Sequence, residues 1–294
     1  MTKRESGAPS SRRLALCAAA LGALAIAVPG HGQQRAGEPP VVAPPPPVAS
    51  FADLAALTES AQIVVLVEVR DQAVVEPERA PGLAPGHARL YLEARTQALL
   101  AGRSGLGQDL VYLADVPLLA NGRPPKLGKQ RFVLYANSVP ERPGSLQLIA
   151  PDSYVPATPE SEALARWVIA ALAAPEAPPP LGAIREVMSV AGNLAGESET
   201  QLFFATDDGQ PVSLTVIRRP GMAPQWGVSW TEIVDQAARP PAPDTAEWYR
   251  LACFLPERIP ASAFLQEDRA ARTRAEADYQ VIREQLGPCT RLRG

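Results

Sequence analysis

The stretch FADLAALTESAQIVVLVEVR, residues 51–70, decides the fold of this chain. In its first half, Phe51, Leu54 and Leu57 recur at helical spacing, which predicts a short amphipathic helix over residues 51–60. Its second half is rich in β-branched residues, which predicts a strand. We therefore expect the folded part of the chain to begin with a helix that leads directly into a strand.

Four more segments read as short strands, and Gly- and Pro-rich stretches separate them. In the first of these segments Leu90 and Leu92 alternate with Tyr91 and Glu93, which is the pattern of a half-buried strand. The four segments are residues 88–96, 109–116, 130–136 and 145–150. Five short strands with turn signals between them predict a small closed or half-closed β-barrel over residues 51–150.

A second helix is predicted after Thr158, which can cap it, and Pro159 suits its first position. The apolar stripe that follows contains Trp167, which we expect to face the core. Prolines at 178–180 lie beyond this helix and mark a domain boundary. Residues 151–180 are therefore predicted to be a helix and a proline-rich linker.

The remainder, residues 181–294, is predicted to form a second small α+β domain. It begins with a helical stretch at residues 181–190, followed by a hairpin of strands 199–206 and 211–219 and a third strand at 225–234. Residues 245–255 are predicted to form a strand, with a helix as the alternative, and a long final helix lies within residues 262–286. The predicted fold class is α+β: a five-stranded barrel, a linking helix and a second domain that ends in a long C-terminal helix.

The first 32 residues have the layout of a secretory signal peptide. Basic residues precede an apolar run of about fifteen residues, which is shorter than the ~20 that a membrane-spanning helix needs. Small residues suit cleavage near Gln33, and Cys17 lies too early in the run for lipidation. We expect export to the periplasm or the medium, with residues 33–50 as a proline-rich disordered spacer.

Removal of this peptide leaves 24 basic and 30 acidic side chains, a net charge of −6. An acidic chain argues against a nucleic-acid partner, which requires a basic face. No later apolar stretch approaches spanning length, so no stable membrane span is expected after cleavage. Cys253 and Cys289 are the two remaining cysteines, and an oxidising compartment predicts one disulfide between them, with two free buried thiols as the alternative.

The mature chain offers few groups for catalysis. His87 is its one histidine, and a Pro/Gly-rich loop position indicates a solvated side chain. One histidine and a bonded pair of cysteines cannot supply a Cys/His zinc site, and the sequence contains none of the common catalytic or nucleotide-binding motifs. We therefore predict no catalytic residue, no metal and no cofactor.

Two tryptophans are the main candidates for a binding site. Trp226 and Trp230 share one face of a predicted strand, where they could stack on a sugar ring or hold a partner protein. Arg218 and Arg219 lie beside them and could add contacts to an anion. The alternative is that this strand face packs in the core.

Three carboxylates support a different hypothesis. Glu197, Glu199 and Asp208 could serve as acid and base in a hydrolase. The alternative is that they are turn and strand-edge residues, because Asp-Gly is common in hairpin turns.

Some stretches resemble known sequences. The segments FADLAALTESAQIVVLVEVR, ARLYLEARTQALLAG and GKQRFVLYA are similar to a recurrent domain of unknown function in exported bacterial proteins. This resemblance implies an OB-like or TIMP-like barrel over residues 51–150. GESETQLFF, PQWGVSW and EWYRLACFLP resemble uncharacterised exported proteins of gram-negative bacteria, and neither resemblance implies an activity.

These observations favour a periplasmic, non-enzymatic protein of binding or envelope-structural type, whose partner is an unknown envelope protein or glycan. The first alternative is a carboxylate-dependent envelope hydrolase. The second is an inhibitor or partner-binding module with an exposed apolar patch near Trp226 and Trp230.

Overall fold

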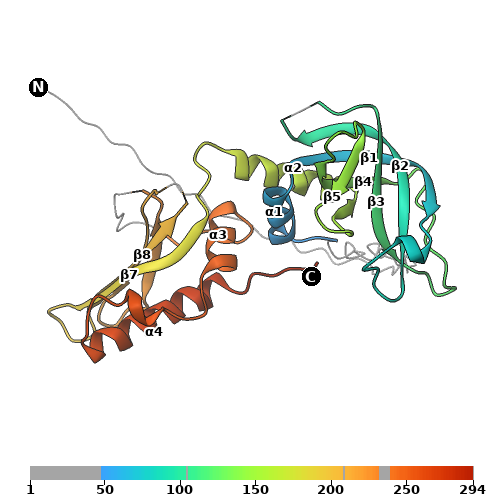
Figure 1. The fold of residues 1–294 in the computed structure, drawn as a ribbon. Coiled ribbons are helices and arrows are strands. Elements are labelled where there is room, and N and C mark those ends of the chain that lie inside the picture. Colours follow the sequence, from blue (N-terminus) through green and yellow to red (C-terminus); the bar gives the residue numbers. More distant parts are fainter. Residues whose placement is uncertain (1–47, 104, 208, 232–238, 294) are drawn as a thin grey trace, which may run out of the picture. The chain divides into compact units, whose positions relative to one another are not determined.

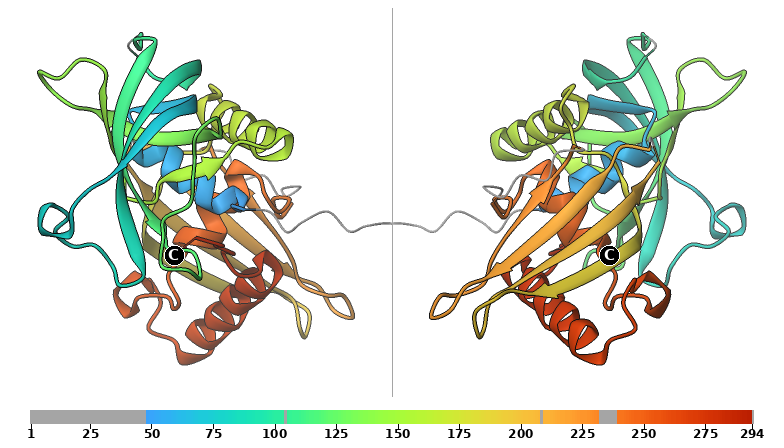
Figure 2. Two further views of the ribbon diagram at one scale, coloured as in Figure 1. Left: turned by 90° about the vertical axis from the view of Figure 1, so that its right-hand side faces the viewer. Right: turned by 90° about the vertical axis from the view of Figure 1, so that its left-hand side faces the viewer.

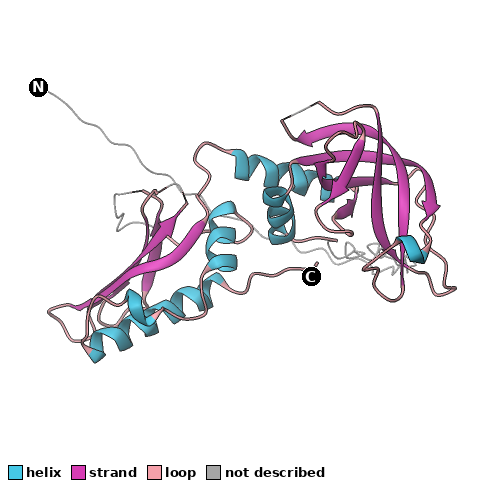
Figure 3. Ribbon diagram, in the orientation of Figure 1, coloured by secondary structure: helices cyan, strands magenta, loops and turns pink. Residues whose placement is uncertain are grey.

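The computed structural model describes residues 48–293 except 104, 208 and 232–238. The predicted signal peptide, its cleavage near Gln33 and almost all of the proline-rich spacer lie outside the described residues. Within them the fold is α+β, with a closed five-stranded mixed β-barrel, a second sheet and four α-helices (Figures 1 and 3).

The first helix, α1 (Phe51–Ser60), begins with a capping box. The Ser50 hydroxyl accepts a hydrogen bond from the backbone N–H of Asp53 (3.1 Å), and the Asp53 carboxylate accepts one from the backbone N–H of Ser50 (2.8 Å). Phe51 and Leu54 are buried on one side of the helix. The helix predicted over residues 51–60 is confirmed.

Five strands close the barrel in the order β1-β2-β3-β5-β4, and β4 pairs again with β1. All neighbouring strands are antiparallel except β3 and β5, which are parallel. A short sixth strand, β6, extends from β4. The strands are β1 (Ile63–Val74), β2 (His87–Ala101), β3 (Asp109–Pro117), β4 (Arg131–Ser138), β5 (Ser145–Leu148) and β6 (Tyr154–Pro156). The five predicted strands of the barrel are confirmed.

Strand β1 is buried on both faces where its sequence reads IVVLV. Val65 and Val67 belong to the apolar cluster inside the barrel. Val64 and Leu66 alternate with them and belong to a second cluster, together with Leu54 of α1. A strand that is covered on both faces has a continuous apolar run instead of an alternating one.

The second helix, α2 (Pro159–Ala173), begins at Thr158 as predicted. The expectation that Trp167 faces the core is wrong, because 48% of its surface is exposed. Only Ala165 and Val168 of this helix are fully buried, so a narrow stripe of α2 meets the core. Trp167 instead makes an edge-to-face contact with Phe51, with ring centroids 5.1 Å apart.

Four strands form the second sheet in the order β10-β9-β8-β7. They are β7 (Leu181–Ala191), β8 (Ser198–Thr206), β9 (Val212–Arg218) and β10 (Gln225–Ser229). The hairpin predicted over residues 199–206 and 211–219 is confirmed, and the predicted third strand ends at Ser229.

The helical stretch predicted over residues 181–190 is wrong, because this segment is strand β7. Register shifts interrupt its pairing with β8 between Leu181 and Ile184 and again between Ile184 and Glu186. These irregularities leave Ile184 and Val187 as buried residues three positions apart. That spacing imitates a helical stripe in the sequence.

Two helices complete the second half, and the segment read as a strand over residues 245–255 is one of them. This helix, α3 (Ala246–Phe254), begins at the side-chain cap of Thr245. Its residues 248–251 are all buried, so burial does not alternate along it. A short 3-10 turn, η2 (Ala261–Ala263), precedes the final helix, α4 (Arg269–Leu286), which confirms the predicted long C-terminal helix.

Figure 2 shows α4 lying beside the second sheet, where it contacts β7 and β8. Among the described residues, no helix combines the length and the apolar character that crossing a bilayer requires.

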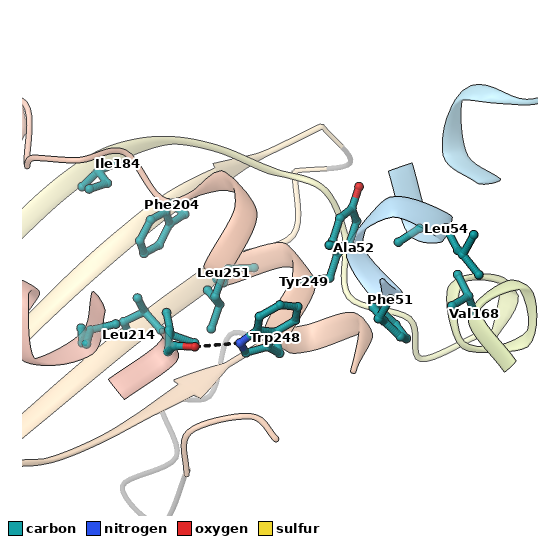
Figure 4. Close-up of a cluster of buried hydrophobic side chains, with 14 of the residues drawn as sticks. Phe51, Ala52, Leu54, Val168, Ile184, Phe204, Leu214, Trp248, Tyr249 and Leu251 are labelled. Carbon is teal, nitrogen blue, oxygen red and sulfur yellow. Dashed lines mark hydrogen bonds between the residues drawn. The ribbon is translucent and has the colours of Figure 1, made fainter. Parts of the chain in front are cut away.

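One apolar cluster connects the outer side of the barrel to the second sheet (Figure 4). It contains Phe51 of α1, Tyr249 and Leu251 of α3, and Leu214 of β9. Polar contacts follow the same line: the carboxylate of Glu59 accepts from the Tyr249 hydroxyl (3.0 Å) and pairs with the Arg250 guanidinium (2.5 Å). The core therefore continues across the proline-rich linker.

The predicted disulfide between Cys253 and Cys289 is present, with Cα atoms 4.9 Å apart. It joins the end of α3 to the segment that follows α4. The alternative of two free thiols is thereby excluded in this structure.

A buried ion pair fixes α4 to the second sheet. Asp278 of α4 is fully buried, and its carboxylate accepts from the Arg218 Nε of β9 (2.5 Å) and from the Thr200 hydroxyl of β8. The Thr200 hydroxyl also lies 2.9 Å from the hydroxyl of Ser189. Because Arg218 and Thr200 come from β9 and β8, Asp278 binds the helix to two strands directly, and Thr200 extends the contact to Ser189 of β7.

We expect Asp278→Ala to lower the free energy of unfolding by about 2–4 kcal/mol, because it leaves Arg218 and Thr200 without their partner. The lower part of the range applies because 32% of the Arg218 side chain is exposed. Urea unfolding followed by circular dichroism measures the change. The control is Glu276→Ala, an exposed position on the same helix, with an expected change within about 0.5 kcal/mol. Equal midpoints for the two variants would contradict the role of Asp278.

Buried tyrosines predict an alkaline limit to stability. Desolvation raises the pKa of Tyr279 to about 12, and it also raises the pKa of Tyr112, Tyr135 and Tyr249. The unfolded chain loses these protons near pH 10 while the folded chain keeps them. The contribution of these tyrosines to the free energy of unfolding is therefore complete below pH ~10, and it is lost as the pH rises toward ~12.

Absorbance at 295 nm and circular dichroism, recorded together against pH, test this expectation. Ionisation of the buried tyrosines should coincide with loss of secondary structure. Tyr279→Phe should lose less stability between pH ~10 and ~12 than the wild type does. Ionisation of all tyrosines near pH 10 with the fold intact is the result that would refute it.

Candidate functional site

The structure places the predicted tryptophans against the core. Trp226 is 3% exposed, and its indole N–H donates to the Gln285 side chain (2.8 Å). Trp230 is half-buried and packs on the same apolar cluster. These positions agree with the alternative of a core-facing strand, and a binding role for the two residues stays an untested prediction.

The two predicted arginines have separate partners. Arg218 is held by Asp278, as described above. Arg219 is exposed, and its guanidinium donates to the Gln225 side chain (3.1 Å). Anion binding by this pair also stays a prediction.

The carboxylates of the hydrolase hypothesis lie in local contacts. Glu197 Oε2 accepts from the backbone N–H groups of Asn193 (3.1 Å) and Leu194 (3.2 Å), which closes the β7–β8 turn. Glu199 accepts from the side chain of Gln201 (2.7 Å). Asp208 lies outside the described residues. Among those described, no group of three or more His, Cys, Asp or Glu side chains could hold a metal ion.

A groove on the outer face of the barrel is the site that the sequence did not single out. It has a volume of about 890 Å³ and lies over β2, β3 and β5, with the β1–β2 and β4–β5 connections at its sides. We call it the barrel groove. Its lining includes Val74, Glu76, Arg79, Arg89, Tyr91, Val111, Leu113, Arg142, Gln147 and Pro151.

Strand register brings apolar side chains together in the barrel groove. Tyr91 of β2 lies opposite Leu113 of β3 on one side and Ala73 of β1 on the other. Tyr91 is 39% exposed and Leu113 is 47% exposed. Because Leu90 and Leu92 fill the barrel interior, alternation forces Tyr91 outward. The result is an aromatic and aliphatic surface in the middle of a sheet.

An ion pair lies beside this apolar surface, two residues along the strands from the pair Tyr91 and Leu113. Arg89 lies opposite Asp115 in the register and donates to both carboxylate oxygens, at 2.7 and 2.8 Å. The hydrogen bond to Asp115 raises the pKa of Arg89 above its ordinary value. Arg89 also donates to the carbonyl oxygen of Pro81 (3.2 Å), so the pair fastens the β1–β2 connection to the sheet.

Two arginines at the sides of the groove are free of ion pairs among the described residues. Arg79 ends the 3-10 helix η1 (Pro77–Arg79) in the β1–β2 connection, and Arg142 lies in the β4–β5 connection. Both side chains are exposed and line the groove, together with Glu76. Their guanidinium groups can therefore donate hydrogen bonds to a molecule on the sheet.

A second hollow of about 560 Å³ adjoins the barrel groove and shares Pro151 with it. His87, Tyr154 and Arg293 contribute to its lining. His87 is exposed, as predicted, but it is the first residue of β2 and not a loop residue, and its Nδ1 lies 3.1 Å from the carbonyl oxygen of Pro85.

The sequence contained one signal for the groove. In residues 88–96 the outward positions of the alternating pattern hold Arg89, Tyr91 and Glu93, and an aromatic residue there is unusual for a solvent-facing row. The other residues of the groove come from distant strands and loops. No known protein family matches this chain, and no curated protein is detectably similar to it in sequence.

Proposed function

We propose that this chain is a non-enzymatic binding protein of the bacterial envelope, and that the barrel groove binds an extended oligosaccharide. The observation that carries the proposal is the exposed pair Tyr91–Leu113 at the centre of an open groove. The sequence of residues 1–32 supports export, because it has the layout of a secretory signal.

The strand order supports an OB-like identity for the barrel. Antiparallel strands in the order β1-β2-β3-β5-β4, closed on β1 with a parallel β3–β5 pair, agree with a five-stranded Greek-key barrel of that kind. Such barrels bind oligonucleotides and oligosaccharides on the face of strands two and three, between the connections that follow strands one and four. The barrel groove lies in the corresponding place. This support is an analogy between folds and adds to the argument from the residues.

Charge and shape narrow the class of ligand. The net charge of −6 expected after export disfavours an oligonucleotide. An open groove on a sheet suits an extended chain better than a small molecule, which would need an enclosing pocket. The Tyr91 ring can pack on the apolar face of a sugar, and Arg79 and Arg142 can donate to its hydroxyl or carboxylate groups.

Titration of the purified protein with soluble peptidoglycan glycan chains tests the proposal. Calorimetry gives the affinity, and NMR of the ¹⁵N-labelled protein locates the bound chain. We expect Tyr91→Ala to weaken binding about 5–30-fold, because it removes the stacking surface. Tyr91→Phe should stay within about threefold of the wild type, because it keeps the ring.

The matched control is Leu119→Ala, which changes an apolar residue that is 51% exposed and does not line the groove. It should leave the affinity unchanged. Equal affinity of Tyr91→Ala and the wild type, or shifts confined to the second sheet, would remove the barrel groove from the proposal. Cleavage of the glycan over time would instead favour the hydrolase alternative, with Glu197, Glu199 and Asp208 as the first residues to change.

A further inference from the structure

The segment after α4 connects the disulfide to the start of the barrel. We call residues 288–293 the C-terminal strap. Its anchor is Cys289, which is bonded to Cys253 at the end of α3. Its far end, at Leu292 and Arg293, contacts the N-terminal turn of α1.

The carboxylate of Asp53 accepts the hydrogen bonds from the far end of the strap. Asp53 is 3% exposed, and its carboxylate also accepts a hydrogen bond from the backbone N–H of Ser50. The backbone N–H of Leu292 donates to Oδ2 of Asp53 (3.0 Å), and that of Arg293 donates to Oδ1 (3.4 Å). The carboxylate thus holds two separate parts of the chain.

Arg293 continues the strap into the hollow beside the barrel groove. Its guanidinium donates to the carbonyl oxygen of Asp152 (2.5 Å) and lines the hollow that contains His87. The position of the strap therefore determines one wall of that hollow.

The strap gains little from apolar burial. Thr290 and Arg291 are exposed, and Leu292 is 50% exposed. A few hydrogen bonds to carboxylate and carbonyl oxygens hold the strap in place. Their stabilisation must exceed the loss of conformational entropy when the residues of the strap become ordered. Because the disulfide fixes Cys289, only the residues beyond it remain to be ordered. The bond thereby favours the docked strap.

One cysteine of the disulfide, Cys289, lines a third hollow of about 470 Å³. Cys289 lines this hollow together with Ala252, Leu255, Gly287 and Pro288, and both cysteines are half-buried. A thiolate that enters the hollow therefore lies next to Cys289, which is the approach that thiol–disulfide exchange requires.

We propose that Cys253–Cys289 is a thiol–disulfide exchange site that latches the C-terminal strap onto Asp53. The thiolate of a dithiol reductant attacks Sγ of Cys289, the Cys253–Cys289 bond breaks, and Cys253 leaves as a thiolate that takes up a proton. The second thiol of the reductant then displaces Cys289. Two electrons and two protons pass to the protein, and the reductant becomes a disulfide. The reduced protein stays folded, releases the strap and opens the wall formed by Arg293.

Hydrogen exchange of the strap amides tests this proposal independently of any glycan. The oxidised ¹⁵N-labelled protein is compared with protein reduced by dithiothreitol, and mass spectrometry after iodoacetamide counts the free thiols. We expect the Leu292 and Arg293 amides to exchange at least about tenfold faster once two thiols are counted. The amides of Leu90 and Leu134 in the barrel should keep their protection.

Two variants distinguish the effect of the disulfide from that of the hydrogen bonds to Asp53. Cys253→Ser with Cys289→Ser should show fast exchange without reductant. Leu292→Pro removes the N–H that donates to Asp53, so the Arg293 amide should exchange fast while the disulfide stays intact. The proposal is overturned if the strap amides stay protected in the reduced protein, if the barrel amides lose protection with them, or if dithiothreitol does not reduce the folded protein.

Discussion

The burial of strand β1 on both faces is the constraint on which the rest of the structure depends. One face fills the barrel, and the other presents Val64 and Leu66 outside it. Closure of the barrel buries only the inner face of β1. The outer face needs a cover, which α1 and the cluster around α3 supply. Helix α1, the barrel and the second sheet therefore all belong to the apolar core around this five-residue run.

Local patterns predicted the elements whose burial follows a simple period. Helix α1, strands β2 and β3 and the cap of α2 at Thr158 agree with periodicity and capping, because one face of each element meets one core. Strands β1 and β4 are buried on both faces, and their continuous apolar runs predicted them. Strand β7 was read as a helix because register shifts leave Ile184 and Val187 at helical spacing. Alternation within residues 245–255 predicts a strand, with a helix as the alternative, and the structure has helix α3, in which neighbours on all sides bury residues 248–251. In both cases tertiary contacts decide the outcome.

The candidate site was less predictable than the fold. Trp226 and Trp230 are candidates from the sequence because aromatic residues dominate many binding surfaces, yet packing against the core uses the same residue type. The barrel groove combines Tyr91, Leu113, Arg79 and Arg142, which come from four separate segments. Only the closure of the sheet places them on one surface. The outward position of Tyr91 was readable in the alternation of β2, but its partners were not.

The apolar cluster shared by α1, α3 and β9 has a consequence for how the molecule can be divided. A cut at the proline-rich linker would separate Phe51 from Tyr249, whose ring centroids lie 6.4 Å apart, and Glu59 from its ion-pair partner Arg250. A barrel trimmed at residues 178–180 for a fusion protein would therefore expose apolar surface that the full chain buries.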